Sequence, residues 1–448
     1  MAEDGAPSPL ELIHRALGEN RPKLARRIVR RMHPGQLADL LESLPLDERA
    51  MVWELVDAEK DAEVLLNVHD EVREWLIRQM ELPEVLAAVQ GIDLGDVAEL
   101  LPQMPEEVSA EVLRSLDLED RERLGQILSY PEDGAGGMMR HDHIPVRAEV
   151  SLGAVLRYLR RRGDIPPQTN LLVVIDRGYR YQGVLRLRHL ITNQPKRRVG
   201  EVMEKDFRPI PVDMDAEEVV KIFEQRDMVS APVVNAEGIV LGRITVDEVV
   251  DVIREEAEHS IMSMAGLDEE ADMFAPVLVS SRRRAVWLGI NLLTAFLAAW
   301  VIGLFEATLQ QVVALAVLMP VVASMGGIAG SQTLTLMIRG LALGYVAPGN
   351  RGILLGKEIA VGVVNGFLWA LVVGVMTYAW FGDPRLGYVI ALAVLANLLA
   401  AALAGVVIPL VLDRFGVDPA LAGGVVLTTV TDVVGFFAFL GLGSLLLL

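Results

Sequence analysis

The sequence predicts a multidomain protein of α and α+β domains with a membrane domain: a superhelical N domain made of helices, two α+β repeats, a connecting helix and five transmembrane helices. Its 448 residues suffice for two to four domains, and a mean hydropathy of +0.38 is too high for an ordinary soluble protein. Residues 282–448 hold eight Lys and Arg against six Asp and Glu, whereas the segment before them carries a net charge of −21. An acidic soluble portion is therefore joined to an almost uncharged apolar portion.

Composition excludes several classes of protein. A surface this acidic repels phosphate backbones, so nucleic acid is not an expected partner. Without Cys there is no disulfide framework, thiolate metal site or Cys nucleophile. No nucleophile and base set, phosphate-binding Gly loop or His cluster stands out among seven His, so we expect no enzyme.

The first 130 residues predict an acidic helical N domain. Residues 37–45 match residues 97–105, a spacing of 60, and both copies carry apolar residues at helical spacing followed by Pro. We expect stacked helix pairs that form a small superhelix. The first 19 residues contain no apolar run typical of a signal peptide, so we expect the soluble portion in the cytoplasm.

A turn-rich linker, residues 131–137, precedes a second internal repeat. Residues 144–146 match 210–212, and each copy predicts a strand, a helix, a buried strand, a turn, another strand and a final helix. The two copies, residues 131–200 and 201–258, resemble a tandem pair of CBS domains.

CBS pairs often bind adenine nucleotides, and a Thr or Ser followed by an acid after the last strand usually holds the ribose. The second copy has Thr245 and Glu248 at these places, whereas the first has Arg186 and His189. ATP or another adenine nucleotide is therefore one expected ligand. The alternative is a cation-responsive dimerisation module.

Five runs with almost no charge predict five transmembrane helices within a domain of residues 282–448, because a bilayer core takes about 20 helical residues. The runs are 285–305, 307–338, 359–382, 386–412 and 419–448. With the acidic portion inside, nearly all basic residues near the helix ends fall on the cytoplasmic side. The odd number then places the C-terminus outside.

Two features within these runs are unusual. The second carries Pro320 and a stretch of small residues, 326–332, which fits either close helix packing or a helix lining a pore. The last carries Asp432, with Thr428, Thr429 and Thr431 just before it. A carboxylate in hydrocarbon costs roughly 2.5 kcal/mol or more, so it faces a bundle interior or water. A structural partner for a buried base is the alternative to a cation pathway, but the last run has no Lys or Arg.

Acidic residues gather before the membrane domain, between Asp247 and Glu258. Such a run is often a solvated helix face. Like charges at this density also favour a hard cation with oxygen ligands.

The whole chain resembles the MgtE family of magnesium transporters or channels. The order of parts matches from end to end. The most specific matches are residues 130–139, Pro320 with 326–332, residues 416–420, and residues 431–435. The resemblance implies a homodimer with the pore between the two membrane halves, cytosolic domains that sense magnesium, and a connecting, or plug, helix over residues 259–281.

The resemblance also assigns site residues. It places the pore carboxylate at Asp432 and implies that Asp418 faces the plug helix. The magnesium-sensing acids that it implies are Glu63, Glu99, Asp215, Glu217, Asp227, Glu248 and Glu256. The pore lining that we expect comprises Pro320, Gly326, Gly327, Ile328, Gly330, Gln332, Thr428 and Thr431.

The sequence departs from the family pattern at three places. Ile328 stands where the family usually has Asn, His259 and Ser260 stand where acids are common in the plug helix, and Gly95 replaces an acid. These departures bear on ion selectivity and on the magnesium threshold for gating.

We therefore expect a Mg²⁺-selective channel or transporter for magnesium uptake, gated by intracellular Mg²⁺ at the acidic cytosolic domains. Its partners would be a second copy, the lipid bilayer and Mg²⁺ as substrate and regulator, in the plasma membrane, the inner membrane of a bacterium. Mg²⁺ dehydrates reluctantly, so a pair of Asp432 carboxylates suits a hydrated ion. One alternative is a channel for Co²⁺ or Mn²⁺, and another is a membrane-anchored nucleotide sensor without transport.

Overall fold

The computed structural model describes all residues except 1–7, 20, 91, 132 and 268–270. The chain forms two compact units. The first comprises Met1–Ala257 with Glu270–Ala275, and the second comprises Glu258–Glu269 with Pro276–Leu448.

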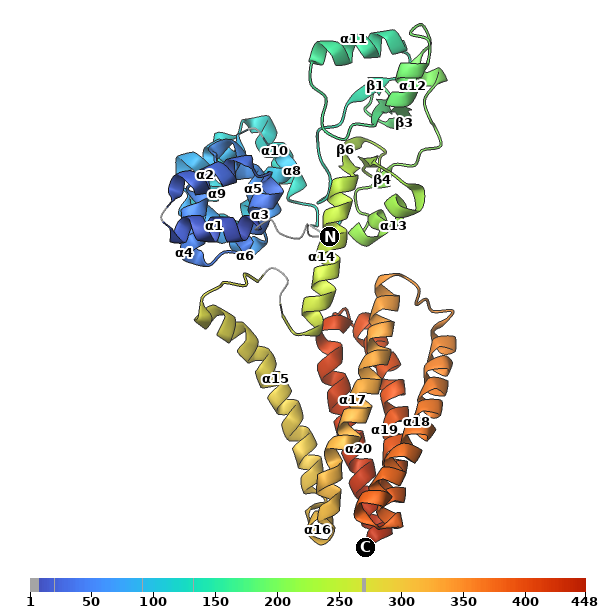
Figure 1. Cartoon of the computed structure of the whole chain (residues 1–448). Helices are drawn as coiled ribbons and strands as arrows, with labels where there is room; N and C mark the ends of the chain where they lie inside the picture. The colour runs from blue at the N-terminus through green and yellow to red at the C-terminus, as the bar shows by residue number, and fades with distance from the viewer. Residues whose placement is uncertain (1–7, 20, 91, 132, 268–270) are drawn as a thin grey trace. The chain divides into compact units, whose positions relative to one another are not determined.

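The N domain of the first unit is helical (Figure 1). Its elements are α1 (Pro9–Gly18), α2 (Pro22–Arg31), α3 (Pro34–Glu42), α4 (Leu46–Trp53), η1 (Ala58–Lys60), α5 (Asp61–Asn67), α6 (Asp70–Gln79), α7 (Leu82–Val89), α8 (Leu94–Leu100), η2 (Leu101–Gln103), α9 (Glu106–Ser115) and α10 (Leu118–Ile127). Side chains at several N-termini, such as Asp93 and Asp117, accept bonds from free backbone N–H groups. Aliphatic residues of nearly all these helices share one core.

Helix pairs in this domain repeat every 24 residues. The first members begin at Pro34, Ala58, Leu82 and Glu106, and the second members at Leu46, Asp70, Leu94 and Leu118. The predicted stacking of helix pairs is confirmed, but the predicted spacing of 60 is not the structural period. It aligns α3, the first helix of a pair, with α8, the second helix of another, because both begin with the same apolar pattern.

Two three-stranded sheets follow the N domain, and each orders its strands as they occur in the chain. The first copy contains β1 (Pro145–Arg147), α11 (Leu152–Arg162), β2 (Leu171–Ile175), β3 (Tyr181–Arg186), α12 (Leu187–Thr192) and η3 (Val199–Glu201). The second contains β4 (Ile210–Pro211), α13 (Ala216–Arg226), β5 (Ser230–Val234), β6 (Val240–Thr245) and the start of α14 (Val246–Met264). In both, the first two strands pair in parallel and the last two antiparallel, with a register shift near the end of the middle strand. The predicted repeat is confirmed.

The connecting helix differs from its predicted bounds of 259–281. Helix α14 begins at Val246, directly after the last strand, and ends at Met264, while residues from Val277 onward already belong to the next helix. Glu is a good helix former, and the charged run from Asp247 to Glu258 contains four Glu, so it continues the helix.

The second unit contains five helices that are long and apolar enough to span a membrane, as predicted. Its elements are α15 (Val277–Gly303), α16 (Glu306–Gln311), α17 (Val313–Ala342), α18 (Arg351–Phe381), α19 (Pro384–Arg414) and α20 (Pro419–Leu447). The spanning helices extend past several of the predicted ends, because charged residues can continue a helix beyond the apolar run. The start of the second predicted run forms the separate short helix α16.

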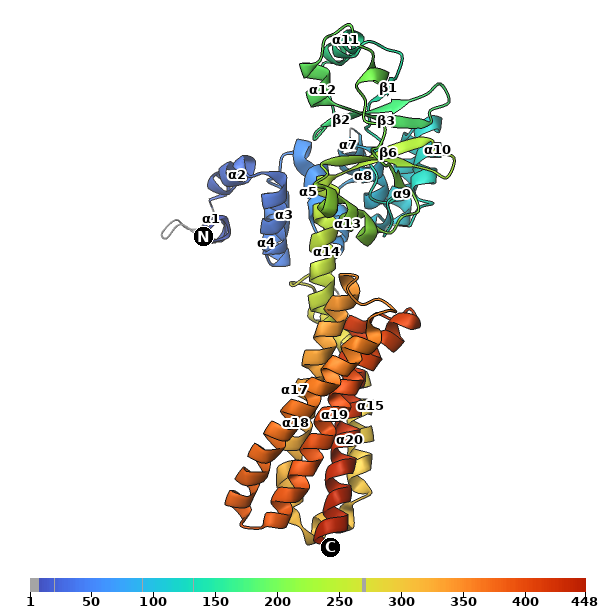
Figure 2. The ribbon, with the colours of Figure 1, turned by 90° about the vertical axis from the view of Figure 1, so that its right-hand side faces the viewer.

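Helix α19 is the most buried of the five and packs against α17, α18 and α20 (Figure 2). Glycines make the contacts close: a Cβ on Gly387 would lie 2.7 Å from the carbonyl oxygen of Gly374 on α18. By contrast, few residues of α15 are buried, namely Ala298 and Val301.

Candidate ion pathway and cytosolic binding sites

The small-residue stretch of α17 has two faces. A Cβ on Gly326 would lie 2.2 Å from Nδ2 of Asn397, and one on Gly330 would lie 2.9 Å from Leu427. Both glycines therefore serve helix packing within this chain, and the structure does not place them on an open face as predicted. Close helix packing, the alternative to a pore lining, accounts for the face of α17 that carries these two glycines.

The opposite face of α17 is not covered by other helices within the part of the chain that the structure describes. Pro320, Ile328 and Gln332 are exposed, and Ile328 exposes 58% of its surface. A Cβ on Gly327 would meet nothing within 4 Å. These four predicted residues share an open face that can meet lipid, water or a second copy.

Asp432 lies half-buried on α20. Within the described part of the chain, its carboxylate makes no hydrogen bond or ion pair. Thr428, one turn earlier, is exposed, whereas Thr431, also a predicted pore residue, is fully buried within this chain. Because no base contacts Asp432 among the described residues, a structural ion pair does not account for this carboxylate.

The threonines before Asp432 bond to their own helix. Thr428 Oγ1 donates to the Gly424 carbonyl at 2.9 Å, and Thr431 Oγ1 donates to the Thr428 carbonyl at 3.0 Å. Their donors are satisfied, so Thr428 presents a hydroxyl oxygen that can still accept a bond from an ion's water shell.

Asp418 caps α20 and faces the connecting helix. Its oxygens accept bonds from the N–H groups of Ala420 and Leu421, at 2.8 and 3.1 Å. His259 Nε2 on α14 lies 3.3 Å from Asp418 Oδ2. Asp418 thus lies beside α14, and the capping bonds already use its carboxylate.

Two membrane residues were not singled out from the sequence. Asn397 is fully buried on α19, donates from Nδ2 to the Val322 carbonyl at 2.8 Å, and also packs against Gly435. Glu358 on α18 is buried and accepts a 3.2 Å bond from Thr333 Oγ1. A lone Asn in a charge-free run could have drawn attention, whereas Glu358 lay at the edge of such a run.

The implied magnesium-sensing acids do not converge. Within the part of the chain that the structure describes, no group of three or more His, Asp or Glu could hold a metal ion. Asp215 caps α13, Glu217 pairs with Lys221, and Asp227 ends α13 in the left-handed conformation. The exposed acids Glu63 and Glu256 lie on α5 and α14.

Two of these acids are paired with arginines. Glu99 Oε1 accepts a 2.9 Å bond from Arg73, and Glu248 Oε1 accepts a 3.2 Å bond from Arg140. Arg140 also lies 3.4 Å from Asp96, so it joins the N domain to the second CBS copy. Burial raises the pKa of Glu248 to about 7 even though Arg140 acts in the opposite direction.

A second ion pair involves Asp142, two residues after Arg140. Arg243 on β6 is buried and donates to both oxygens of Asp142, at 2.7 and 2.8 Å. Burial alone would raise the pKa of Asp142, but the bond and charge of Arg243 outweigh it and hold that pKa below its usual range. Neither Arg140 nor Arg243 could be singled out from the sequence, because the carboxylates that they bond lie far away in the chain.

The first unit contains a cavity of about 620 Å³. Its lining includes Asn170, Arg186, Glu204, Phe207 and Ser230. Arg186 Nε donates to Glu204 at 2.9 Å, and its guanidinium lies 5.7 Å from the centre of the Phe207 ring. The cavity therefore offers a cation, an acid and an aromatic face.

The cavity is not where the sequence placed the nucleotide. Thr245 is buried, with Oγ1 unpaired among the described residues, Glu248 is held by Arg140, and neither lines the cavity. The hollow lies instead beside Arg186, in the copy whose ribose pattern differs. Strand ends from both copies build it, which a motif within one copy cannot reveal.

Comparisons with known proteins agree with this architecture. Residues 319–442 match a family model described as a divalent cation transporter, residues 32–133 match the MgtE intracellular N domain, and residues 199–255 match a CBS domain. A magnesium transporter MgtE of Thermus thermophilus is 32% identical over 446 residues, covering 97% of this chain and 98% of the relative. One of Bacillus subtilis is 26% identical, covering 94% of this chain and 93% of the relative.

A solved structure gives the same result for the soluble portion. It is titled the cytosolic domain of the Mg²⁺ channel MgtE in complex with ATP, and it matches with 30% identity and a TM-score of 0.50. It covers 54% of this chain and 99% of its own. The chain therefore belongs to the MgtE family of magnesium transporters.

Proposed function

We propose that this magnesium transporter conducts hydrated Mg²⁺ past Asp432, in a pore that the open face of α17 and the adjacent α20 form with a second copy. The observation that carries the proposal is the carboxylate of Asp432, which has no cationic partner among the described residues. A charge in an apolar helix is costly and is typical of an ion path. Two such carboxylates across a two-fold axis would attract a divalent ion without stripping its water.

The test is ion flux through the full chain reconstituted in vesicles. Asp432→Ala is expected to abolish Mg²⁺ flux, and Asp432→Asn to reduce it strongly. Asp413→Asn is the control, because Asp413 ends α19 and lies 3.9 Å from Arg351. Flux at the wild-type level in Asp432→Ala would remove this residue from the mechanism.

Cation selectivity is a second question for the same assay. The exposed Ile328 puts an apolar side chain on the open face, where the family usually has a polar one. Fluxes of Mg²⁺, Co²⁺ and Mn²⁺ should therefore be compared. If Ile328 faces the pore, Ile328→Asn raises preference for Mg²⁺. An unchanged preference would show that this position does not set selectivity.

Gating by intracellular Mg²⁺ is the regulatory part of the proposal. The portion before residue 282 carries a net charge of −21, so its acidic parts repel one another unless cations bind. Asp215, Glu217, Asp227, Glu63 and Glu256 remain the proposed sensing acids. Glu99 and Glu248 would join them after release from Arg73 and Arg140.

Limited proteolysis of the full chain tests the gating proposal. Millimolar Mg²⁺ should slow cleavage between residues 1 and 267, because bound cations favour the compact state. Neutralising Asp215, Glu217 and Asp227 together should weaken this protection. Equal cleavage with and without Mg²⁺ would contradict the proposal.

The cavity beside Arg186 is the proposed adenine nucleotide site. The guanidinium suits a phosphate, and Asn170 and Ser230 can bond polar groups of a nucleoside. The MgtE relative solved with ATP is 30% identical over the soluble portion, which supports the same ligand class here. Calorimetry with ATP should show binding that Arg186→Ala weakens and Thr245→Val leaves unchanged.

The proposed setting is a bacterial inner membrane, with the N domain in the cytoplasm and the C-terminus outside. Basic residues at the ends of α15, α17, α18 and α19 support this orientation. Labelling of Leu448→Cys from the outside alone is expected, since the chain has no Cys of its own. Labelling from the cytoplasmic side alone would overturn it.

A further inference from the structure

Arg49 of the N domain is charged and fully buried. Its Nε donates to the Leu41 carbonyl at 2.8 Å, and its guanidinium lies 5.6 Å from the centre of the Trp75 ring. Its two terminal nitrogens donate to the two oxygens of Asp272, at 2.6 and 2.9 Å. Asp272, 223 residues away in sequence, is buried as well. A buried cation of this kind depends on its carboxylate partner.

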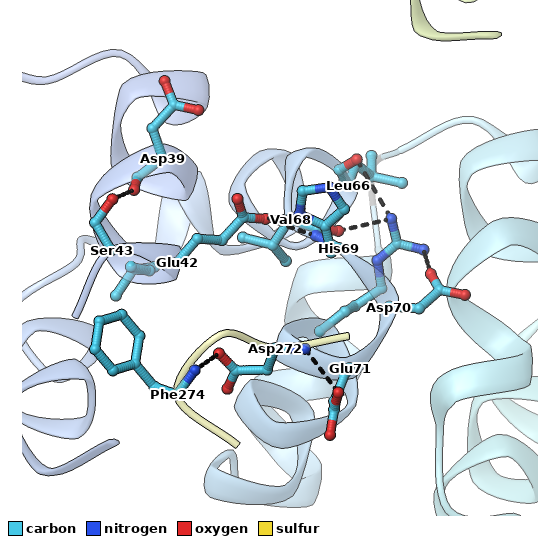
Figure 3. Close-up of polar contacts among 12 residues, drawn as sticks. Asp39, Glu42, Ser43, Leu66, Val68, His69, Asp70, Glu71, Asp272 and Phe274 are labelled. Carbon is cyan, nitrogen blue, oxygen red and sulfur yellow. Dashed lines mark hydrogen bonds and ion pairs between the residues drawn. The ribbon is translucent and has the colours of Figure 1, made fainter. Parts of the chain in front are cut away.

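Residues 271–275, which we name the strap, are shaped around Asp272 (Figure 3). The Asp272 N–H donates to Glu71 Oε2 at 2.7 Å, and the Phe274 N–H donates to Asp272 Oδ1 at 2.9 Å. The Ala275 N–H donates to the Asp272 carbonyl at 3.1 Å. Backbone and side chain of the strap are thus both held, by α4 and α6 of the N domain.

The helix repeat shows what is particular about Arg49. Arg73 and Arg121 occupy the same place in their helix pairs, 24 and 72 residues later, and each donates from Nε to the carbonyl eight residues before it, as Arg49 does. The Arg73 guanidinium then bonds to the Val68 carbonyl and to acids of the N domain. That of Arg121 bonds to the Leu116 carbonyl. Arg49 instead bonds to the strap.

The repeat also indicates a second hydrogen-bonding arrangement for the Arg49 guanidinium. Leu44 stands five residues before Arg49, as Val68 and Leu116 stand before Arg73 and Arg121. If the strap leaves, the Arg49 guanidinium can turn to that carbonyl, as its two counterparts do. The buried charge then keeps hydrogen-bond partners, so release of the strap does not require the N domain to unfold.

The strap leads directly into the first membrane helix. Val277, where α15 begins, is five positions after Asp272, and an extended chain of five steps reaches at most about 17 Å. While Asp272 stays bound to Arg49, the N domain cannot move farther than this from the start of α15. A displacement of the N domain beyond this reach would therefore pull on α15.

We propose that the strap is a reversible latch, in which Arg49 holds Asp272 and so couples the N domain mechanically to the first transmembrane helix. The coupling to gating rests on the proposed function, whereas docking of the strap does not. With the strap released, closure of the cytosolic part no longer reaches α15 by this route.

Thiol labelling of the full chain tests the docking. Ala275→Cys is a half-buried reporter, and Met273→Cys, at a position that is 87% exposed, is a reporter that should label quickly in every variant. Arg49→Gln and Asp272→Asn should each raise labelling of the Ala275→Cys reporter by about tenfold or more, because a buried ion pair opens. The double variant should match the single ones, since both remove one interaction.

Arg121→Gln is the matched control, since it removes the repeat arginine whose bonds stay within the N domain. It should leave labelling at Ala275→Cys unchanged. Asp272→Asn lies outside the helices of the N domain, so it tests docking even if Arg49→Gln impairs their folding. Equal labelling in wild-type background, Arg49→Gln and Asp272→Asn would overturn the latch.

Flux measurements test the coupling separately. Asp272→Asn should raise severalfold the internal Mg²⁺ concentration that halves flux, while Arg121→Gln should not. Faster labelling with an unchanged dependence on internal Mg²⁺ would overturn the coupling. If wild-type flux does not respond to internal Mg²⁺, the gating proposal fails, and the labelling result still decides docking.

Discussion

Two carboxylates of the cytosolic unit differ from Asp432 of the membrane unit in what they contact. In the cytosolic unit, the carboxylates of Asp142 and Asp272 are bonded to buried arginines. In the membrane unit, Asp432 contacts no cation among the described residues. The difference separates carboxylates that hold the fold together from one that is available to a mobile ion.

The largest expected effect appears when stability and ion flux are both measured for a variant in each unit. Asp142→Asn should leave Arg243, which is 4% exposed, without its carboxylate and lower the stability of the cytosolic unit by about 3 kcal/mol. Asp432→Asn should leave thermal stability unchanged, because it makes α20 more apolar, while reducing flux. Thermal unfolding in detergent, followed beside flux, measures both.

The comparison would fail if both variants lost stability. Destabilisation by Asp432→Asn would mean that its carboxylate supports the bundle, as the carboxylates of the cytosolic unit support theirs.

The two faces of α17 give the next effect. Gly326→Ala places a methyl group 2.2 Å from Asn397 Nδ2, so it should destabilise the bundle by about 1–3 kcal/mol. Gly327→Ala adds its methyl group where nothing lies within 4 Å, so the bundle of the single chain should keep its wild-type stability. The melting temperature in detergent distinguishes them, and equal stability would contradict the packing of α17 on α19.

The raised pKa of Glu248 predicts a pH effect. A carboxyl that titrates near 7 in the folded protein and near 4.3 when unfolded binds its proton more tightly when folded. Its contribution to stability is complete below about 4.3 and is lost as pH rises to about 7. Glu248→Gln should therefore gain about 1–2 kcal/mol relative to wild type between pH 5 and pH 8. A difference that does not vary with pH would refute the shift.

The smallest effect concerns Arg140. Arg140→Gln should leave Asp96 and Glu248 without their shared cation, so that a divalent ion can take its place. Added Mg²⁺ at ten times its dissociation constant should then stabilise this variant by about 1.4 kcal/mol more than wild type. Calorimetric melting with and without Mg²⁺ measures this difference. Arg73→Gln, which removes the cation bonded to Glu99, is a second variant for the same measurement. Equal stabilisation of wild type and variant would show that Arg140 does not replace an ion.

Much of this architecture could be predicted because it depends on local pattern. Charge-free runs reveal spans whatever their neighbours, and the strand pattern of the CBS pair occurs twice in the chain. The isolated Asp432 could be identified for the same reason. Helix boundaries were less accurate, since an acidic run such as Asp247 to Glu258 is compatible with both a solvated face and a continuous α14.

The missed features depend on pairs of residues distant in sequence. Nothing near Asp272 identifies Arg49 as its partner, and nothing near Arg186 shows that strand ends of two domains enclose a cavity there. The 24-residue period was hidden because the strongest match in the sequence aligns α3 with α8, which are different members of their pairs. Likewise, glycines lie on both faces of α17, so the sequence does not show which of them pack against other helices.

Asn397 has a consequence for how this sequence can diverge. Its amide occupies the space that side chains at positions 326 and 435 would need, on two other helices. A smaller residue at 397 would remove the bond to the Val322 carbonyl but create room at both glycines. Substitutions at these three positions are therefore not independent, and among relatives they should change together or not at all.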